Sequence, residues 1–204
     1  MKVVAFNCSA RLNGNTSVLL SHVLEPIEAQ GISTETFVLA GKKVHGCTAC
    51  MKCHETRDGR CSGLRDYGNE CIEAAVAADG IIIASPVYFA DITAEAKALV
   101  ERLGYIGRAN PEILRHKVGA AVIAARRAGA MHAFDSINHL FLISEMIVPG
   151  SSYWNIGMGG PPGAVAQDEE GIRTMTTLGA NIAWLLRKTR GTDDVDSSLD
   201  VKIP

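Results

Sequence analysis

The stretch KVVAFNCSARLNGNTS, residues 2–17, decides how this chain begins to fold. Its first part, 2–8, is a short apolar run with β-branched residues, which indicates a strand buried inside a sheet. A loop of small and polar residues follows at 9–17 and leads into a segment, 17–31, whose apolar residues recur at helical spacing. That segment ends at a glycine, the residue type that most often caps the C-terminus of a helix. A strand, a loop and a helix in succession indicate the repeating unit of an α/β sheet.

Strand-like and helix-like segments alternate along the whole chain. The expected strands are 2–8, 33–39, 80–89, 116–125 and 147–156, and the expected helices are 17–31, 67–80, 92–106, 130–146 and 169–188. The strand runs are continuously apolar, which is typical of strands that helices cover on both faces. The pattern therefore predicts an α/β fold in which an open parallel sheet forms the middle of a three-layer sandwich. The sequence shows no internal repeat and no second domain, so we expect a single domain over 1–190.

The composition excludes several functional classes. The chain has 204 residues, of which 47% are hydrophobic and 21% charged, and its formal net charge is −2. This balance gives no basic surface for nucleic acid or for a membrane, and no apolar run approaches the ~18–20 residues of a membrane span. The apolar stretch at the N-terminus is too short for the core of a signal peptide. We therefore expect a cytoplasmic protein without disulfides or a nucleic-acid or membrane partner, and a flexible polar tail at 191–204.

Three loops are expected at one edge of the sheet. In doubly wound sheets, ligands bind beyond the carboxyl ends of the strands, where 9–17, 85–89 and 125–131 fall. The first loop offers backbone N–H groups, hydroxyl and amide side chains and the charge of Arg11 at the start of a helix, which suits a phosphate. It lacks the lysine of a nucleotide-triphosphatase loop and the GxGxxG spacing of a dinucleotide site, so a lone phosphate monoester is the better match. The alternative is a polar turn whose side chains only cap the helix.

The other two loops each have a structural and a functional interpretation. SPVYF (85–89) ends the third expected strand. Its Pro86 turns the backbone out of the sheet, and its two aromatic residues lie where a planar ligand could stack. ARRAGAM (125–131) offers Gly129 and neighbouring amides at the same edge. Taken alone, these loops are a routine strand exit and a routine helix start, but together with 9–17 they place a phosphate cradle and an aromatic platform on one side of one sheet.

The segments SARLNGNTS, SPVYF and DEEGIRTMTTLG resemble the NADPH-dependent FMN reductase branch of the flavodoxin-like proteins. The resemblance covers roughly residues 1–188. It implies a flavodoxin-like three-layer sandwich with a five-stranded parallel sheet, in the strand order 2-1-3-4-5, and FMN as the cofactor. It also implies which residues contact FMN: Ser9, Arg11, Asn13, Asn15, Thr16 and Ser17 at the phosphate, Pro86, Val87, Tyr88 and Phe89 along the flavin ring, and Ala125, Arg126 and Gly129 at its polar edge, with Trp154 nearby.

Four of the six cysteines lie in HGCTACMKCHETRDGRC, residues 45–61. Their spacing, Cys47-x2-Cys50-x2-Cys53-x7-Cys61, matches at its first three positions the ferredoxin-type run that holds a [4Fe–4S] cluster. The x2 links let neighbouring thiolates face one metal centre, and the x7 link is long enough for the fourth to close the cage. This cysteine-rich insertion, which we place at 43–66, resembles that of the iron–sulfur flavoproteins, and the resemblance implies that the four cysteines are cluster ligands. The acidic stretch of that subgroup corresponds here to RDYGNE, with Asp66 as its one aspartate, and the fourth spacing is long for the subgroup.

Other chemistry remains open for these cysteines. Zinc prefers two separate CxxC knuckles joined by a longer span, whereas here the two overlap. A CxxC redox pair usually sits at the start of a helix, and nothing in this stretch requires a helix start. The thiols can also be free. We interpret the flanking His45 and His54 as exposed loop residues, and Cys8 and Cys71 as core residues because they fall on an expected strand and an expected helix.

The sequence thus predicts a redox protein in which the flavin supplies the chemistry and the chain positions it. One hypothesis is an electron-transfer iron–sulfur flavoprotein that takes electrons from a ferredoxin-like donor and passes them to a small acceptor. The second is a cluster-free reductase of FMN or quinones that uses NAD(P)H, and the third is a zinc-stabilised binding module. No side chain stands out as a catalytic acid or base. The long loop between the second and third expected strands and the family resemblance together imply a homodimer or a homotetramer.

Overall fold

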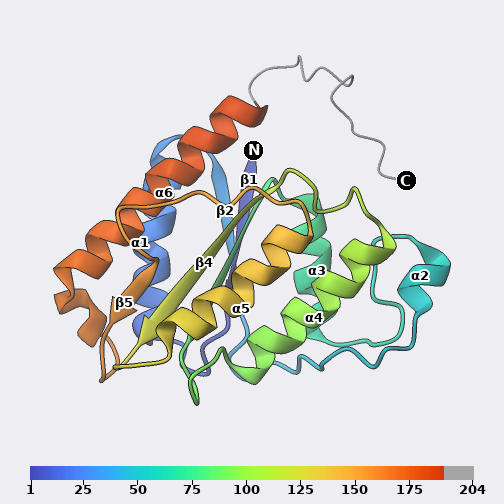
Figure 1. Ribbon diagram of the computed structural model, residues 1–204, viewed down its shortest axis with the longest axis horizontal. Coiled ribbons are helices and arrows are strands. Elements are labelled where there is room, and N and C mark those ends of the chain that lie inside the picture. The colour runs from blue at the N-terminus through green and yellow to red at the C-terminus, as the bar shows by residue number, and fades with distance from the viewer. Residues whose placement is uncertain (191–204) are drawn as a thin grey trace.

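The computed structural model describes residues 1–190 and folds them into a three-layer α/β sandwich, with the sheet between two layers of helices (Figure 1). The strands are β1 (Lys2–Asn7), β2 (Ser33–Val38), β3 (Gly80–Pro86), β4 (Val118–Ala125) and β5 (Ile156–Met158). The helices are α1 (Asn15–Ala29), α2 (Lys52–Thr56), α3 (Tyr67–Ala77), α4 (Ala94–Ala109), α5 (Ala130–Ile143) and α6 (Glu169–Arg190), with a short 3-10 helix, η1 (Ala164–Gln167). The predicted tail at 191–204 lies outside the described residues.

The order of the sheet follows from β1, which has a parallel neighbour on each side. β1 pairs with β2 and with β3, and β4 and β5 continue beyond β3, which gives the order β2-β1-β3-β4-β5. Asn7 at the end of β1 lies opposite Val38 of β2 and Ala84 of β3. Because all the strands run in one direction, the loops that follow them share one edge of the sheet. The predicted five-stranded parallel sheet and its order are confirmed.

Each face of the sheet has its own hydrophobic core. α1 and α6 cover one face, where Leu19 and Leu178 belong to the same buried cluster. α3, α4 and α5 cover the other face, where Leu99 and Phe141 belong to the second cluster (Figure 1). Side chains of β1 alternate between the two clusters, so its continuously apolar sequence is the pattern of a strand covered twice.

The predicted last strand, 147–156, is wrong in its position. Of those residues only Ile156 belongs to β5, and Ile147 makes an isolated bridge with Val118. Pro149 has no N–H to donate to a ladder and Gly150 beside it weakens any strand, so this segment leaves the sheet as coil. The true β5 ends later, and its exit loop therefore reaches the carboxyl edge at residues that the sequence analysis had not considered.

The segment between β2 and α3 also differs from the prediction. It contains the short helix α2, which begins inside the cysteine-rich stretch, where no helix was predicted. Across residues 1–190, none of the helices combines the length and the apolar character that crossing a membrane requires.

Candidate functional site

A cavity of about 210 Å³ opens at the carboxyl edge of the sheet, where the loops after β1, β3, β4 and β5 meet. Most of its lining comes from residues that the sequence analysis had singled out. The lining residues are Ser9, Arg11, Gly14, Asn15, Thr16, Pro86, Val87, Tyr88, Ala124, Arg126, Gly159 and Gly160. The structure thus brings together the first loop, the β3 exit and the β4 exit, as expected.

Hydrogen bonds inside the first loop fix its shape. The Ser9 N–H donates to Asn7 Oδ1 and the Arg11 N–H donates to Ser9 Oγ, each over 3.1 Å. The Ser17 hydroxyl donates to Leu12 O over 2.7 Å and accepts from the Asn7 amide over 2.9 Å. Ser17 therefore holds the loop from within and does not line the cavity.

Thr16 presents a buried hydroxyl that has no hydrogen-bond partner among the described residues. The residue is 1% exposed and lines the cavity. Leaving such a group unpaired costs about 1–3 kcal/mol of stability. A ligand that forms a hydrogen bond with the Thr16 hydroxyl would remove this cost. Arg11 and Arg126 line the same cavity, and the first turn of α1, which carries no acidic residue, adds the positive end of its dipole. These features suit a phosphate.

Asn15 joins the first loop to the loop after β5. Its Nδ2 donates to Gly159 O over 2.8 Å and to Pro161 O over 3.0 Å, and its Oδ1 accepts from the Val165 N–H over 3.2 Å. A Cβ on Gly159 would lie 2.5 Å from Val165 N, so only glycine fits there. Gly159 and its neighbour Gly160 line the cavity but were not among the predicted contacts. The signal that could have found them is the run GGPPG after the last strand, which the misplacement of β5 concealed.

The other predicted contacts lie outside the cavity lining, namely Asn13, Ser17, Phe89, Ala125 and Gly129. The Ala125 carbonyl accepts from the Gly159 N–H over 2.8 Å and so supports the cavity from behind. Gly129 has a φ of 85°, and a Cβ there would lie 2.6 Å from Ala90 Cα, so glycine allows the β4 exit to approach the β3 exit. Phe89 is fully exposed, with a φ of 48°. The contact of these residues with a cofactor stays a prediction.

Asp91 holds the loop that carries Tyr88 against α5. Its carboxylate accepts from the Ile92 N–H over 2.7 Å and from the Ser136 hydroxyl over 2.8 Å, and His132 Nε2 lies 3.4 Å away. Partial burial raises the pKa of Asp91, but these two hydrogen bonds and the neighbouring positive side chains outweigh it, so the pKa of this carboxyl lies below its usual value. The ionised form is therefore the one that fixes the loop.

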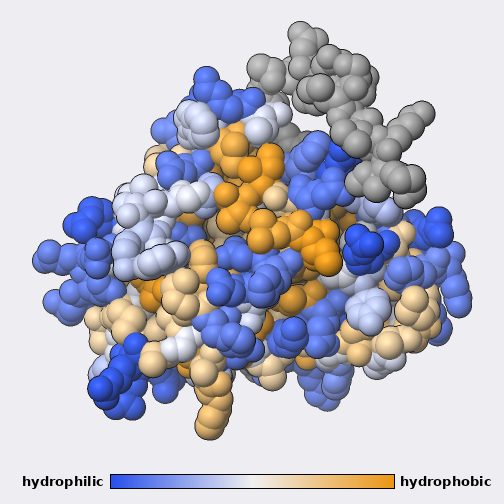
Figure 2. Space-filling view, viewed as in Figure 1, coloured by the Kyte–Doolittle hydropathy of each residue, from blue (hydrophilic) through white to orange (hydrophobic). Residues whose placement is uncertain are grey.

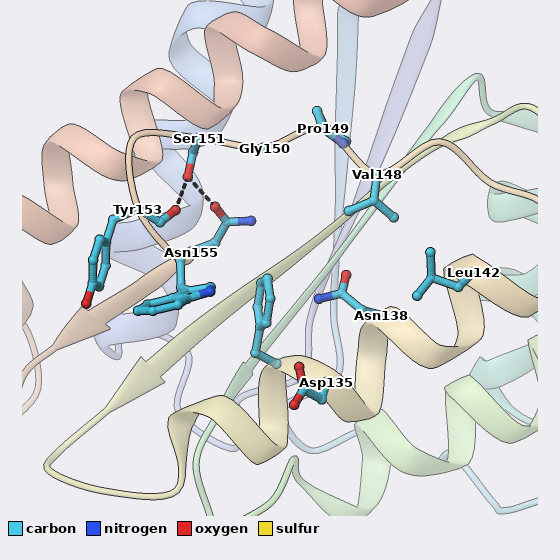
Figure 3. Close-up of a pocket in the computed structure, with 11 residues that line it drawn as sticks. Asp135, Asn138, Leu142, Val148, Pro149, Gly150, Ser151, Tyr153 and Asn155 are labelled. Carbon is cyan, nitrogen blue, oxygen red and sulfur yellow. Dashed lines mark hydrogen bonds between the residues drawn. The ribbon is translucent and has the colours of Figure 1, made fainter.

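Trp154 is not among the residues that line the carboxyl-edge cavity. It lines a second cavity of about 540 Å³ between α5 and the coil that precedes β5 (Figure 3). In that coil, the Ser151 hydroxyl donates to Tyr153 O over 2.5 Å and to Asn155 Oδ1 over 2.6 Å. The predicted proximity of Trp154 to a flavin stays a prediction.

The four cysteines of residues 45–61 line one small cavity of about 20 Å³, together with Arg102 and Tyr105 of α4. Glu101 of the same helix accepts a hydrogen bond from the Cys47 N–H over 3.3 Å. Four thiols on one cavity are the donor set of an iron–sulfur or zinc site. Within residues 1–190, however, no group of three or more His, Cys, Asp or Glu side chains is arranged to hold a metal ion. The donor set fits a metal site in its chemistry, while the thiols as placed do not form a closed coordination shell.

The cysteine side chains differ in their electrostatic surroundings. Partial burial raises the pKa of Cys53, and the nearby thiols of Cys47 and Cys61 raise it further. The backbone N–H of Lys52 lowers the pKa of the exposed Cys50. Cys8 and Cys71 are buried in the core, as predicted, and burial raises the pKa of Cys71 to about 12. The thiols that line the cavity therefore lie in different electrostatic surroundings from the two buried core thiols, Cys8 and Cys71.

The backbone around these thiols is strained. Ala49, Met51 and Arg57 have φ values of 51°, 59° and 49°, which place non-glycine residues in the left-handed region. Such conformations cost about 1–3 kcal/mol each and gather at functional sites. Left-handed residues between successive cysteines reverse the chain, so that the thiols turn toward one cavity. Met51 also precedes α2, so Cys50 and Cys53 span a helix start, which the sequence did not predict.

A family model, NADPH-dependent FMN reductase, matches residues 1–160. This chain belongs to the NADPH-dependent FMN reductase family. It is therefore an oxidoreductase with a flavin-binding fold, and the resemblance in its loops is confirmed.

Curated relatives of this FMN reductase family member cover nearly its whole length. An iron-sulfur flavoprotein of Methanocaldococcus jannaschii is 35% identical in an alignment that covers 92% of this chain and 98% of the relative. An iron-sulfur flavoprotein of Methanosarcina thermophila is 31% identical in an alignment that covers 93% of this chain and 99% of the relative.

Solved structures confirm the fold. RosB with a bound 8-demethyl-8-formylriboflavin-5'-phosphate intermediate has a TM-score of 0.73 and 20% identity, over 94% of this chain and 81% of RosB. A flavodoxin from the domain Archaea has a TM-score of 0.60 and 14% identity, over 92% of this chain and 99% of the flavodoxin. At these identities the likeness extends to the fold alone.

For this family member we predict that Asp91→Asn flattens the dependence of stability on pH. Because the pKa of Asp91 is lowered in the folded state, its stabilising effect is present at neutral pH and is lost as the pH falls through that folded pKa. The variant should therefore be less stable than the parent at pH 7, and the gap should close at an acidic pH below the lowered pKa of the folded state, where the carboxyl has taken up its proton. Urea unfolding at both pH values measures this difference. Asp135→Asn makes the same chemical change on α5 away from the loop, and an equal gap at both pH values for Asp91→Asn would contradict the prediction.

Proposed function

We propose that this chain is a redox protein of the iron–sulfur flavoprotein type. In this proposal FMN binds at the carboxyl-edge cavity and a [4Fe–4S] cluster is held by Cys47, Cys50, Cys53 and Cys61. Electrons pass between a reduced donor, either a ferredoxin-like protein or NAD(P)H, and a small acceptor. The observation that carries the proposal is that one domain presents both a cavity with an unpaired buried hydroxyl and a second cavity lined by four thiols. The names of the relatives, which are iron-sulfur flavoproteins, support the same pairing.

The phosphate end of FMN is assigned to the first loop. Thr16 supplies the unpaired hydroxyl, Arg11 and Arg126 supply positive charge, and the amides at the start of α1 supply further donors. At about 210 Å³ the cavity is smaller than the ~300–1,000 Å³ of most small-molecule sites. It is therefore sized for the phosphate and the ribityl chain, and the flavin ring extends over the rim. That position accounts for the exposed aromatic residues Tyr88 and Phe89 on the β3 exit.

The chain's own contribution to the reaction is binding and orientation. FMN, when bound, supplies both hydride and single-electron chemistry. The Val87 N–H donates to Ala124 O over 2.9 Å, which fixes the ring-side loop on the sheet edge. The hydrogen bond from Asn15 to Gly159 O fixes the loop after β5 in the same way. Both sides of the cavity are therefore in place before a ligand binds. A prepared site loses less conformational freedom on binding.

The thiol site is separate from the flavin site within one chain. α4 links the two regions, because its N-cap Thr93 donates to Cys8 O, just before the first loop, and its middle carries Arg102, which lines the thiol cavity. These two residues are nine positions apart, or about 14 Å along the helix axis. Substitutions more than about 7–10 Å apart seldom influence each other, so changes at the thiols should leave FMN binding intact.

A second candidate function is a cluster-free NAD(P)H-dependent reductase of FMN or quinones. It is favoured by the finding that no closed metal-binding group forms among residues 1–190. In that case the flavin works alone and the cysteines are free thiols.

Anaerobic purification followed by absorption spectroscopy and iron analysis distinguishes the two functions. The first predicts a brown protein with about four irons per chain, whereas the second predicts a yellow protein without iron. In the first case, Cys50→Ala should lose the iron and retain FMN, because the variant removes a thiolate ligand far from the first loop. Cys71→Ala, which alters a core thiol, should retain both. A Cys50→Ala protein with undiminished iron would contradict the cluster assignment.

Thr16→Val should separate the stability of the free protein from its affinity for FMN. Removing an unpaired buried hydroxyl should leave the free energy of unfolding of the FMN-free protein unchanged or raise it by up to about 1 kcal/mol. The affinity for FMN should fall about tenfold, which is about 1.4 kcal/mol, because a donor to the phosphate is lost. Urea unfolding and flavin fluorescence titration measure the two quantities. Thr176→Val, an exposed change on α6, should alter neither, and an unchanged FMN affinity in Thr16→Val would contradict the assignment of the phosphate.

We also propose that the protein is a homodimer or a homotetramer. Leu142 and Ile143 at the end of α5 are 65% and 63% exposed, and hydrophobic residues gather in the middle of the face that carries α5 (Figure 2). Extended apolar surface of this kind marks contacts between proteins. Light scattering should give two or four times the chain mass of 21.7 kDa. A mass of one chain at micromolar concentration would exclude the proposal.

A further inference from the structure

Arg102 is among the largest fully buried side chains, and its guanidinium contacts both ends of the cysteine-rich segment. Its Nη1 donates to Asp66 Oδ1 over 2.6 Å and to His45 O over 3.4 Å, and its Nη2 donates to Asn69 Oδ1 over 2.8 Å. Positions 45 and 66 lie on either side of the four thiols. The side chain of Arg102 therefore holds the two ends of the cysteine-rich segment next to each other.

Asp66 is the negative half of this contact. Its side chain is 5% exposed, its Oδ2 accepts from the His45 N–H over 2.8 Å, and its Oδ1 accepts from the Gly68 N–H over 3.0 Å as the cap of α3. Burial raises the pKa of Asp66, but the hydrogen bond and the charge of Arg102 outweigh it and lower the pKa below its usual value. A Cβ on Gly68 would lie 2.3 Å from Arg102 Nη1, so the glycine at this position leaves space for the guanidinium.

The ion pair is oriented relative to the thiols. Arg102 lines the thiol cavity, and Asp66 does not. Arg102 Nε is buried and has no hydrogen-bond partner among the described residues. The positive residue of the pair therefore lines the thiol cavity and keeps one buried N–H without a partner among the described residues, while the carboxylate accepts from the backbone of His45 and Gly68.

We propose that Arg102 is a positioning residue that holds the thiol segment together and raises the reduction potential of the cluster on its thiols. This inference rests on the proposed function. Reduction adds a negative charge to a cluster, and a buried positive charge beside the cluster stabilises that charge. The potential of an iron–sulfur centre responds to nearby charge. Arg102 supplies that charge from outside the ligand set.

The test uses the anaerobically purified full-length protein, with iron per chain, FMN per chain and the midpoint potential of the cluster as readouts. Arg102→Met should lower the midpoint potential by at least a tenfold change in the one-electron equilibrium, which is about 59 mV, and should lower the iron content at least twofold. Asp66→Asn should shift the potential in the opposite direction, because it leaves the positive charge unbalanced, while asparagine still caps α3. Arg102→Lys should restore most of the potential, because it retains the charge. FMN content should be unchanged in all three.

The outcomes separate this inference from the function beneath it. Opposite shifts in Arg102→Met and Asp66→Asn support it, whereas shifts of the same sign, or none, overturn it and show a purely structural ion pair. If Arg102→Met does not fold, Asp66→Asn and Arg102→Lys decide between the same two results. Arg115→Gln, which alters an arginine paired with Glu145 elsewhere on the surface, is the matched control and should leave iron and potential unchanged. A parent protein with FMN but no iron would instead overturn the cluster assignment itself, and this inference with it.

Discussion

The parallel pairing of β1 with both of its neighbours is the constraint on which the rest of the structure depends. The ladder continues past the strand, because the Cys8 N–H donates to Ala84 O over 2.8 Å and the Leu39 N–H donates to Asn7 O over 2.9 Å. These hydrogen bonds align the carboxyl ends of β2, β1 and β3 with one another. Strands that run in one direction place their exit loops at one edge, and that edge is where the cavity with the unpaired Thr16 hydroxyl forms. A slip in this register would separate the loops and remove the cavity.

α4 connects that edge to the thiol segment. Its cap, Thr93, donates through its hydroxyl to Cys8 O over 2.9 Å at the end of β1, and its own hydroxyl oxygen accepts from the Ala96 N–H over 3.2 Å. Farther along the helix, Glu101 and Arg102 hold the cysteine-rich segment by hydrogen bonds. The helix is fixed on the sheet by buried residues such as Leu99. In the function proposed above, one rigid element would therefore hold the flavin and the thiol-bound centre at a constant separation.

Much of the fold and part of the site followed from local pattern. Continuously apolar runs predicted the covered strands, and small polar residues between strand and helix predicted the first loop, because these features are set by neighbouring residues. The loop after β5 was not predicted, because the strand-like composition of 147–156 placed the last strand too early. Pro149 and Gly150 interrupt that run, and the strand begins only at Ile156. The burial of Arg102 could not be predicted either. An arginine within an amphipathic helix is normally exposed. Arg102 can be buried because the Asp66 carboxylate balances its charge and Asn69 accepts a further hydrogen bond, and both residues come from the start of α3.

The sequence by itself determined the alternation of strands and helices, the phosphate-suited loop at 9–17 and the presence of four closely spaced thiols, since each depends on residues that are near one another in the chain. Only the tertiary structure decided that the Thr16 hydroxyl would have no partner among the described residues, that Gly159 would pack against Asn15, and that Arg102 would line the thiol cavity while Asp66 would not. These are contacts between residues far apart in sequence. Their energies come from burial and from the removal of water, and neither exists until the layers have packed.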